Sequence, residues 1–499
     1  MIFNKLKDIV SAIVYIMLCA FILFNTTYFV LKKPLKHYLG SHGKLYSLLF
    51  IIASFIFAIA IVLTFTKLLF RIKLDRQWPA LLLLILTTAI PRLIWIIIIK
   101  VKPLNDFNTY HAFATAFSKG NFIGGGYIAL FPHYVGYPIL LTPFYKLFGT
   151  SANVAAHLNV VLSCGISFLL YFLGSTLFDR KCGLGAAFIW ALWPSQIFYT
   201  ALVSTEIIFT FLMLLCISFF LFIMSSNKGP LPISAWFLLL GVLCSITNVI
   251  RPIGLVVFIS ILIYYLIFTA DKIKLKNSIL TKVIFLTLLV AGYLITSKFI
   301  SIGTSNLINK EVAKYPFGFN IYVGSNYQSK GAWNAEDSKT LTEIEKRPGI
   351  TPQEVHNELL KLSVDRIKSR SLFNTLKFVG IKHGMMWTVD HDSMVYIKAG
   401  LIQQDTKFDF YKFESLLIKL SNFYYHAILL LCGFSGFILL KRKNQGLPLL
   451  LVIIILGIIF LHMIVEVAGR YHFPAICLFS LLASCGISSF FKQDQPKLS

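Results

Sequence analysis

The chain has 499 residues, of which 57% are hydrophobic and only 13% are charged. This composition excludes an ordinary soluble domain and indicates a membrane protein with many spanning helices, because each span needs about 20 apolar residues. The net charge of +25 could suggest a nucleic-acid partner, but much of the basic excess lies in short loops between apolar runs, so we expect a lipid bilayer and no nucleic acid.

Apolar runs predict an all-α, polytopic chain with about twelve transmembrane helices. The first run is long and lacks a small-residue cleavage signature, so we expect it to be retained as a helix. The eight cysteines show no metal-ligand spacing, so we expect no metal site and no cofactor. The runs lie near residues 9–31, 46–70, 79–101, 151–177, 183–202, 206–224, 232–249, 252–269, 279–297, 418–440, 446–464 and 473–491.

Basic loops predict the orientation of these helices. Lys441-Arg442-Lys443 is the strongest marker of the inner side, and three further basic segments fall on the same side when the spans alternate. Both termini are then cytoplasmic. The segment 32–45 is an exception, because it carries four lysines and no acidic residue yet lies outside.

The runs also divide the chain into four parts. Residues 1–78 are expected to form two N-terminal transmembrane helices, and residues 79–298 a module of seven helices with an outer loop over 102–150. Residues 299–414 are expected to form a large extracytoplasmic lobe, because more than half of the acidic residues lie there. Residues 415–499 would then supply three C-terminal transmembrane helices.

The outer loop contains an isolated acidic residue. Asp106 is the only carboxylate between Asp75 and Asp179, and it directly follows a long apolar run. Asn105 can cap a helix in which Asp106, Tyr110, Phe113 and Phe117 share one face. A capped surface helix with an acid favoured near its positive end would explain Asp106 as well, so a functional site and a purely structural role both remain open.

Three arginines are placed against the usual rules for membrane proteins. Arg251 and Arg470 stand at the outer starts of two helices, where both the loop-charge rule and the helix dipole disfavour cations. A bound anion such as phosphate would relieve both conflicts. Arg92 lies inside the third span, where a centred arginine costs about 2.5–3.5 kcal/mol, and snorkelling towards the outer interface is the structural alternative.

Two features stand out in the segment expected to form the lobe. Thr351-Pro352-Gln353-Glu354 predicts a capping box at the start of a helix, with an apolar stripe that would lie on the membrane or on the rest of the protein. Residues 315–333 are rich in Gly, Asn, Tyr and Trp. They are either an ordinary loop or a sugar-contacting surface, with Asn326 and Trp333 as the candidate contacts.

Several short motifs are dispersed over most of residues 79–480. They are Arg92, Asn105-Asp106-Phe107 with Tyr110, Phe131-Pro132-His133-Tyr134 with Tyr137-Pro138, Leu147-Phe148-Gly149, Arg251-Pro252-Ile253-Gly254 and Gly469-Arg470-Tyr471-His472-Phe473-Pro474. In their order and their shared outer face these motifs resemble the GT-C superfamily of integral-membrane glycosyltransferases, and most closely the bacterial branch with aminoarabinose transferases and relatives of protein O-mannosyltransferases. In this branch many relatives carry a second acid after the catalytic one, whereas Phe107 follows Asp106 here.

The resemblance implies a sugar donor carried on polyprenyl phosphate and a multi-pass protein of a bacterial cell membrane, with its site on the extracytoplasmic side. Phosphate is a good leaving group, so only the acceptor hydroxyl needs a base, and one carboxylate suffices. Asp106 is the candidate base, with Glu206 and Glu466 as rivals. Candidate donor-binding residues are Arg251, Arg470, Tyr471, His472, Arg92 and Lys102, and candidate substrate-binding residues are Tyr110, His133, Tyr137, Glu206, Asn326 and Trp333.

Two other functional classes fit parts of the pattern. A transporter or flippase of lipid-linked sugars would share the apolar bulk and the need for a phosphate site, but it usually shows repeated halves and polar groups near the midplane. A non-catalytic scaffold could use the long acidic segment to bind a partner. Neither class accounts for Asp106 together with two misplaced arginines.

The orientation can be tested with single cysteines. Cysteines introduced at Ser118 and Ser338 should react with an impermeant reagent in intact cells, whereas a cysteine at Asn444 should react only after the membrane is opened. The measurement is labelling of each variant before and after permeabilisation. Labelling of position 444 in intact cells would contradict the orientation.

Overall fold

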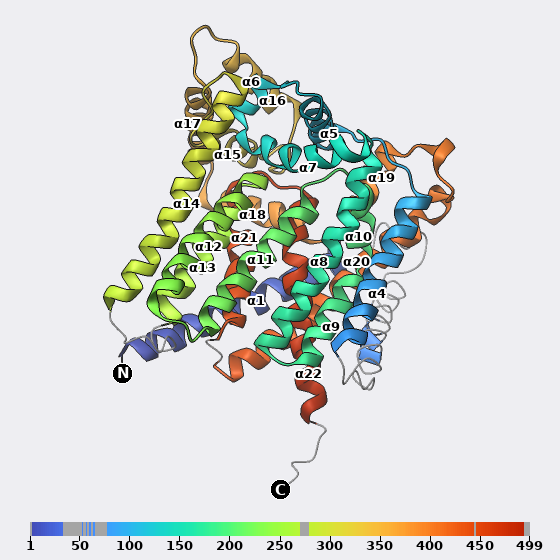
Figure 1. Cartoon of the computed structure of the whole chain (residues 1–499), viewed down its shortest axis with the longest axis vertical. Coiled ribbons are helices and arrows are strands. Elements are labelled where there is room, and N and C mark those ends of the chain that lie inside the picture. The colour runs from blue at the N-terminus through green and yellow to red at the C-terminus, as the bar shows by residue number, and fades with distance from the viewer. Residues whose placement is uncertain are drawn as a thin grey trace.

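A computed structural model of the chain describes residues 2–32, 77–269, 279–443 and 446–493, together with a few isolated positions between 52 and 64. In these residues all regular secondary structure is helical, and an isolated bridge pairs Val101 with Leu401. Long helices run side by side, and short helices gather at one end of them (Figure 1). This arrangement agrees with the all-α membrane architecture expected from composition.

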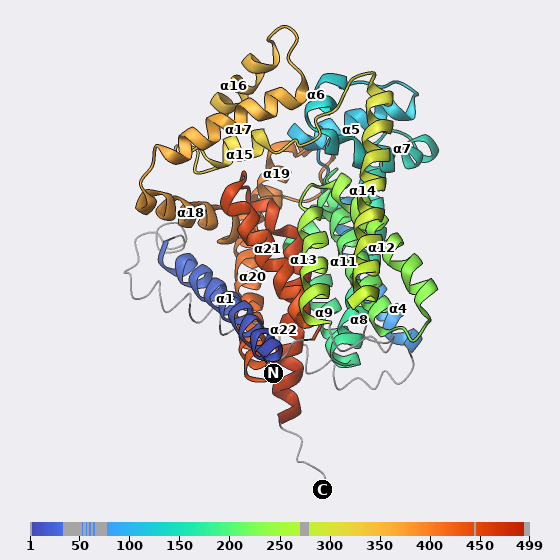
Figure 2. The same ribbon diagram turned by 90° about the vertical axis from the view of Figure 1, so that its left-hand side faces the viewer.

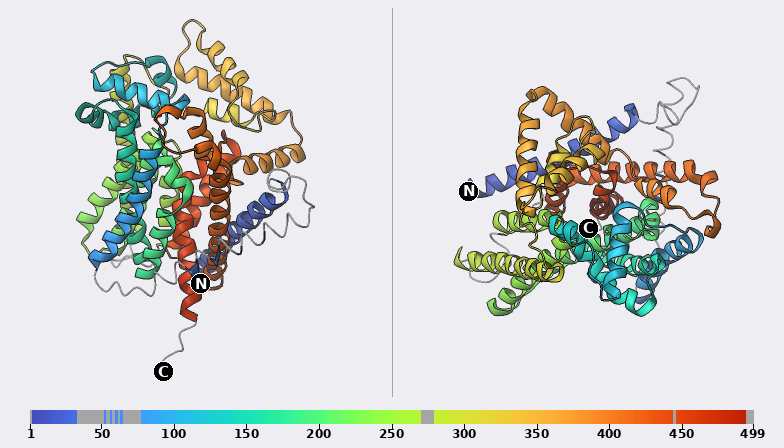
Figure 3. Two further views of the ribbon diagram at one scale, coloured as in Figure 1. Left: turned by 90° about the vertical axis from the view of Figure 1, so that its right-hand side faces the viewer. Right: turned by 90° about the horizontal axis from the view of Figure 1, so that it is seen from above.

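Within the described ranges, eight helices are long and apolar enough to cross a membrane. The most enclosed of them is α22, in which 94% of the apolar window is buried, and it lies among the other long helices when the molecule is seen from above (Figure 3). The eight are α1 (Ile2–Lys32), α4 (Gln77–Ile98), α8 (Ala152–Leu177), α11 (Glu206–Ser225), α12 (Pro230–Ile250), α14 (Ile279–Ile308), α20 (Phe410–Lys441) and α22 (Phe473–Gln493).

The expectation of twelve spans is too high for the described residues. Two expected spans are the shorter helices α13 (Gly254–Phe268, 15 residues) and α21 (Pro448–Ile464, 17 residues). The expected span over 183–202 is wrong, because α9 (Arg180–Ala191) ends early and two short turns follow, α10 (Pro194–Phe198) and η2 (Tyr199–Ala201). The expected span over 46–70 lies outside the described residues.

Proline chemistry explains the break in the expected span. Pro194 is the first residue of α10, and Trp193 before it has an extended backbone with ψ of 117°. A residue before proline is pushed out of the helical region, and proline itself lacks the N–H that a continuing helix requires. The apolar run therefore continues through this region while the helix does not.

The short helices form a layer at one end of the long ones, which we call the end layer (Figure 2). Its members come from two distant parts of the chain. The start of α1 and the end of α22 both lie at the opposite end of the molecule. The end layer consists of α5 (Asn105–Ser118), α6 (Gly125–Leu130), η1 (Pro132–Val135), α7 (Gly136–Phe148), α15 (Gly318–Gly324), α16 (Ala335–Glu345) and α17 (Pro352–Lys368).

The segment 299–414 is integrated into the fold and is not a separate large lobe. Its start continues α14 as far as Ile308, and α17 packs on α6 in the end layer. Two further helices, α18 (Leu372–Trp387) and α19 (Asp392–Gly400), lead back through η3 (Gln403–Asp405) to α20. Because α18 contacts α21 and the turn η4 (Gly469–His472), this segment reaches the start of α22.

The capping box predicted at Thr351 is confirmed. The Thr351 hydroxyl accepts from the Glu354 backbone N–H at 3.3 Å, and the Glu354 carboxylate accepts from the Thr351 N–H at 2.8 Å. Val355 and Leu359, one and two turns further along α17, are buried. The apolar stripe of α17 therefore packs on the rest of the protein and not on the membrane.

Two glycines let α12 and α14 approach closely. A Cβ atom added at Gly241 would lie 2.1 Å from the Leu289 carbonyl oxygen, and one added at Gly292 would lie 2.2 Å from the Leu238 carbonyl oxygen. Small residues at helix crossings favour association in membranes because they allow the two backbones to meet. α14 is thereby attached along α12 and carries the chain towards the end layer.

We predict that Gly292→Val destabilises the protein, because a side chain must force α12 and α14 apart. Overpacking of this kind costs about 1–3 kcal/mol. The matched control is Gly303→Val on the same helix, where an added Cβ meets nothing within 4 Å. Thermal unfolding in detergent should show a lower midpoint for the first variant only, and equal midpoints would contradict the close crossing.

Candidate active site

An ion pair joins Asp106 to Arg470, although 364 residues separate them in the chain. Asp106 is the second residue of α5, and Arg470 lies in η4, the turn that precedes α22. The rings of Phe107 and Tyr396 meet edge to face at 5.0 Å, and the Arg470 guanidinium lies 5.4 and 5.6 Å from their centres. The isolated acid and one of the misplaced arginines thus meet in one place.

The start of α5 differs from the expectation in one respect. Leu104 is the N-cap, without a side-chain hydrogen bond, so the predicted capping role of Asn105 is wrong. Asn105 instead takes a left-handed backbone conformation with φ of 50° as the first helical residue. The expected apolar face is present, since Tyr110, Phe113 and Phe117 are buried.

A second ion pair joins Arg251 to Glu206. The Arg251 Nη1 atom lies 2.6 Å from Glu206 Oε1, and only 1% of the Glu206 side chain is exposed. Burial would lower the pKa of Arg251, but the Glu206 carboxylate raises it above its ordinary value. Both arginines therefore have a carboxylate partner within the protein, which offsets the unfavourable positions noted in the sequence.

Tyr471 lies between the two arginines. The centre of its ring is 5.4 Å from the Arg251 guanidinium carbon and 5.5 Å from that of Arg470. Its hydroxyl donates to Glu466 Oε1 at 3.2 Å. A third carboxylate is thereby brought to the two ion pairs, from the loop between α21 and η4.

The carboxylates of Asp106 and Glu466 differ in their pKa. Burial would raise the pKa of Asp106, but the charge of Arg470 and hydrogen bonds from Arg470 and Tyr134 lower it below its usual value. Burial raises the pKa of Glu466 to about 7, because Arg470 and the Tyr471 hydroxyl only partly offset it and the nearby Asp106 charge adds to it. Asp106 is thus anionic at neutral pH, whereas Glu466 titrates there.

Aromatic side chains line the site behind Asp106. Tyr110 stacks on Tyr134 at 5.0 Å and meets Tyr137 edge to face at 5.7 Å. Burial, together with the positive charge of Arg251, lowers the pKa of His133 to about 4, so this ring is neutral. Among the described residues, the buried His133 Nδ1 and Tyr137 hydroxyl have no hydrogen-bond partner, which leaves them available to a polar ligand.

His472 serves as an anchor of η4 in this structure. Its Nδ1 pairs with the Met386 carbonyl oxygen at 2.7 Å and its Nε2 with Asp390 Oδ1 at 3.2 Å, so both ring nitrogens are engaged. Asp390 also accepts from the Trp193 indole at 2.6 Å and from the Ser195 hydroxyl at 2.7 Å. The expected contact of His472 with a donor phosphate is not the role that these bonds indicate.

Sequence reasoning did not single out Asp390, the partner of His472. It lies between α18 and α19 and binds residues around the break before α10, about 200 positions earlier in the chain. The available signal was an acid within an aromatic and apolar stretch, which by itself does not name a partner. The proline-induced break is what turns Trp193 and Ser195 towards Asp390.

Arg92 and Lys102 are the remaining candidate donor-binding residues. Arg92 is fully buried, so the snorkelling alternative is wrong. Its Nη1 donates to the carbonyl oxygens of Thr88 at 3.0 Å and Ala191 at 2.7 Å. Ala191 is the last residue of α9, and the C-terminal end of a helix favours a cation. Lys102 lines a small space that also borders Phe107 and Tyr396, the two rings that pack on the Arg470 guanidinium.

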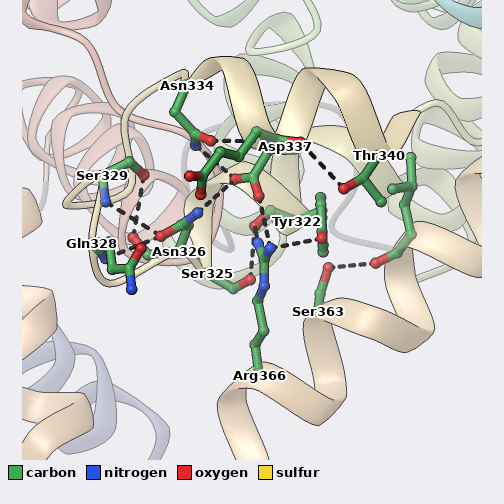
Figure 4. A network of polar contacts seen from close by, with 12 residues as sticks. Tyr322, Ser325, Asn326, Gln328, Ser329, Asn334, Asp337, Thr340, Ser363 and Arg366 are labelled. Atoms are coloured by element: carbon green, nitrogen blue, oxygen red, sulfur yellow. Dashed lines mark hydrogen bonds and ion pairs between the residues drawn. The ribbon is translucent and has the colours of Figure 1, made fainter. Parts of the chain in front are cut away.

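Asn326 belongs to a polar network within the end layer (Figure 4). Its amide donates to Asp337 Oδ2 at 3.1 Å, and its carbonyl oxygen accepts from the backbone of Gln328 and Ser329. The Arg366 Nη2 atom donates to Asp337 Oδ1 at 2.7 Å and to the Tyr322 hydroxyl at 2.6 Å. These contacts give Asn326 a structural role. The segment 315–333 is not simply a loop, because residues 318–324 form α15, and Trp333 is 58% exposed.

Comparison with known protein families finds a match for one part of the chain. Residues 133–295 match the model of a family described as dolichyl-phosphate-mannose-protein mannosyltransferase. The resemblance to relatives of protein O-mannosyltransferases is thereby confirmed, and the segment includes His133, Glu206 and Arg251. Asp106 and Arg470 lie outside it, so the geometry connects them to the matched part.

Solved structures with a similar arrangement of helices cover most of the chain at low identity. The archaeal oligosaccharyltransferase AglB from Archaeoglobus fulgidus, in complex with an inhibitory peptide and a dolichol-phosphate, shares 12% identity with a TM-score of 0.48, over 84% of this chain and 51% of its own. ArnT from Cupriavidus metallidurans, bound to undecaprenyl phosphate, shares 10% identity with a TM-score of 0.33, over 82% and 78%. The chain spans about half the length of AglB. The comparison with curated protein sequences gives no match.

Proposed function

We propose that the chain is a glycosyltransferase that moves a monosaccharide from a polyprenyl-phosphate donor to an acceptor hydroxyl. The observation that carries this proposal is the meeting of Asp106, Arg470 and Glu466 with Arg251 and Glu206. The last two lie in the segment that matches a family named for a dolichyl-phosphate sugar donor. The first three come from outside that segment, so two cations and three carboxylates form one site.

The chemistry needs a base but no acid. In this proposal the acceptor hydroxyl attacks the anomeric carbon and Asp106 takes its proton, while the bond from that carbon to the phosphate oxygen breaks. A single displacement inverts the configuration at this carbon. A positioned base contributes about 10²–10⁴-fold to the rate, and Glu466 is the alternative base because its pKa of about 7 suits proton transfer near neutrality.

The ion pairs suggest how donor binding prepares the base. Guanidinium groups bind phosphate by charge-assisted hydrogen bonds, and Arg470 would then share its charge between the donor phosphate and Asp106. A weaker hold by Arg470 raises the pKa of Asp106 towards its ordinary value, which makes the carboxylate a stronger base. Binding of the donor and activation of the base would thus be coupled through one side chain.

We further propose that the end layer faces the extracytoplasmic side. Lys441, part of the strongest inner marker, is the last residue of α20, a helix that runs from the side of the end layer towards the opposite end of the molecule (Figure 2). A lipid-linked donor would reach the site along the bilayer. The acceptor, which could be a glycan, a lipid-linked sugar or a protein, would arrive at the end layer.

We predict that Asp106→Asn lowers single-turnover transfer by about 10²-fold or more, because the amide keeps the shape of the side chain but cannot accept a proton. Binding of the sugar-free carrier should survive this change. Asp365→Asn, an exposed acid on α17, is the matched control and should leave transfer unchanged. Turnover of a labelled polyprenyl-phosphate sugar by purified protein is the measurement.

The same assay with Glu466→Gln separates the two candidate bases. Activity must rise with pH through the pKa of the base, so a limb near pH 7 that disappears in this variant would assign the role to Glu466. An active Asp106→Asn protein would move the base away from Asp106. Absence of turnover by the natural chain with any lipid-phosphate sugar would favour transport of the lipid-linked sugar.

We predict that Arg251→Ala and Arg470→Ala each weaken binding of polyprenyl phosphate by about 1.5–3 kcal/mol, the value of one charge-assisted contact. Lysine at either position should restore binding only in part, because ammonium lacks the bidentate fork. Equilibrium binding of the sugar-free carrier is the measurement. Arg347→Ala, which breaks an exposed pair with Glu358, is the control and should bind normally.

Truncation of Arg251 also leaves Glu206 buried without its partner, which can unfold the protein. The double variant Arg251→Met with Glu206→Gln removes both charges and keeps the site neutral. Weak carrier binding in the folded double variant would therefore report on the phosphate site itself. Normal carrier binding by both single-arginine variants would contradict the assignment and make Arg92 and Lys102 the next candidates.

A further inference from the structure

A buried lysine that donates hydrogen bonds to four backbone carbonyl oxygens lies next to the site. Lys382 of α18 is fully buried. Its Nζ donates to the carbonyl oxygens of Val465 at 2.7 Å and Gly324 at 2.8 Å, and to those of Met463 and Ile464, both at 3.2 Å. No ion pair with a carboxylate is formed by this group within the described ranges. A buried ammonium of this kind must be held for a reason other than a salt bridge.

The position of these carbonyls gives the reason. α21 ends at Ile464, and the last carbonyls of a helix have no partner within it. They also carry the negative end of the helix dipole, which favours a cation. Lys382 therefore closes the end of α21, and the residue after its last partner is Glu466, the carboxylate that accepts from Tyr471 beside the Asp106–Arg470 pair.

The same loop is fixed by close backbone contacts from the end layer. The Glu466 N–H donates to the Asn320 carbonyl oxygen at 2.8 Å, and the Val467 N–H donates to the Gly331 carbonyl oxygen at 2.9 Å. A Cβ atom at Gly324 would lie 2.4 Å from the Val465 carbonyl carbon, so only glycine allows this approach. The loop from α21 to η4 is thus enclosed by α15, the turn after it and Lys382.

We propose that Lys382 is a positioning residue of the site, which holds the loop after α21 so that Glu466 faces the Asp106–Arg470 pair. This assignment rests on the proposed function, because that function is what requires Glu466 and Arg470 to be held in position. The charge of Lys382 also favours the ionised form of Glu466, while burial and the charge of Arg370 lower the pKa of Lys382 itself to about 7.

Other titratable groups face this pair and enter any pH dependence. His383 of α18 and His462 of α21 border the same small space as Lys382, and Arg470, Asp106 and Tyr471 act on Glu466. Loss of the Lys382 charge should raise the pKa of Glu466, since one of the charges that favour its anion disappears. A pH limb carried by Glu466 would then move to higher pH, and removal of Glu466 would abolish the shift.

The test replaces Lys382 by methionine, which keeps the length of the side chain and removes both the charge and the donors. We expect turnover to fall at least tenfold, the acid limb to move to higher pH, and amide hydrogen exchange of residues 463–472 to accelerate. Lys382→Arg, which keeps the cation, should recover part of the turnover. Lys377→Met, an exposed lysine of the same helix, is the control and should behave as the natural chain.

Two further variants keep the test decisive. Gly324→Ala pushes the same loop with Lys382 in place, so it should produce the same loss of turnover and the same faster exchange if the lysine variant does not fold. In a Glu466→Gln background, Lys382→Met should shift the pH profile no further.

Natural turnover with natural exchange in Lys382→Met overturns the assignment, as does faster exchange with unchanged turnover and pH profile. If the natural chain transfers no sugar, the proposed function fails, while hydrogen exchange still shows whether Lys382 holds the loop.

Discussion

The ion pair between Asp106 and Arg470 is the interaction on which the rest of the site depends. It joins the first short helix of the end layer to the turn before α22, and its two members lie 364 residues apart. Burial of a guanidinium is costly unless a counter-charge and good packing accompany it. Asp106 supplies the charge, and the rings of Phe107, Tyr396 and Tyr471 supply the packing. The two halves of the chain therefore meet at a charged contact and not only through apolar helix faces.

The charges of the site do not balance, and the imbalance defines the chemical states available to it. Arg251 and Arg470 face Asp106, Glu206 and Glu466 in a poorly solvated region. Three carboxylates cannot all ionise at low cost beside two cations, so a proton is retained most readily by the one without an arginine partner of its own. That carboxylate is Glu466, which accepts a hydrogen bond from the Tyr471 hydroxyl. The site can thus hold or release one proton near neutrality without breaking either ion pair.

Local sequence rules predicted the parts of the structure that depend on neighbouring residues. The capping box at Thr351, most of the long helices and the unusual character of Asp106, Arg251 and Arg470 could all be derived from adjacent residues and loop charges. The break at Pro194 followed the same rules but was masked by the continuous apolar run around it. Asp390 and Lys382 could not be found in this way, because each is explained by partners about 60 to 200 positions away. The same limit applies to Asn326, whose amide is engaged by Asp337 and the adjacent turn rather than exposed to a ligand.

The length of α14 has a consequence for where the proposed reaction would take place. Its 30 residues give a rod of about 45 Å, whereas the hydrocarbon core of a bilayer is about 30 Å thick. Its far end meets α6, with Gly125 close to the Ile308 carbonyl oxygen. In the proposed orientation the end layer stands above the hydrocarbon, and the ion pair of Asp106 at the start of α5 lies near the boundary between lipid and water. A catalyst at such a boundary can take a lipid-linked substrate from the bilayer and a hydrophilic one from water without moving either across the membrane.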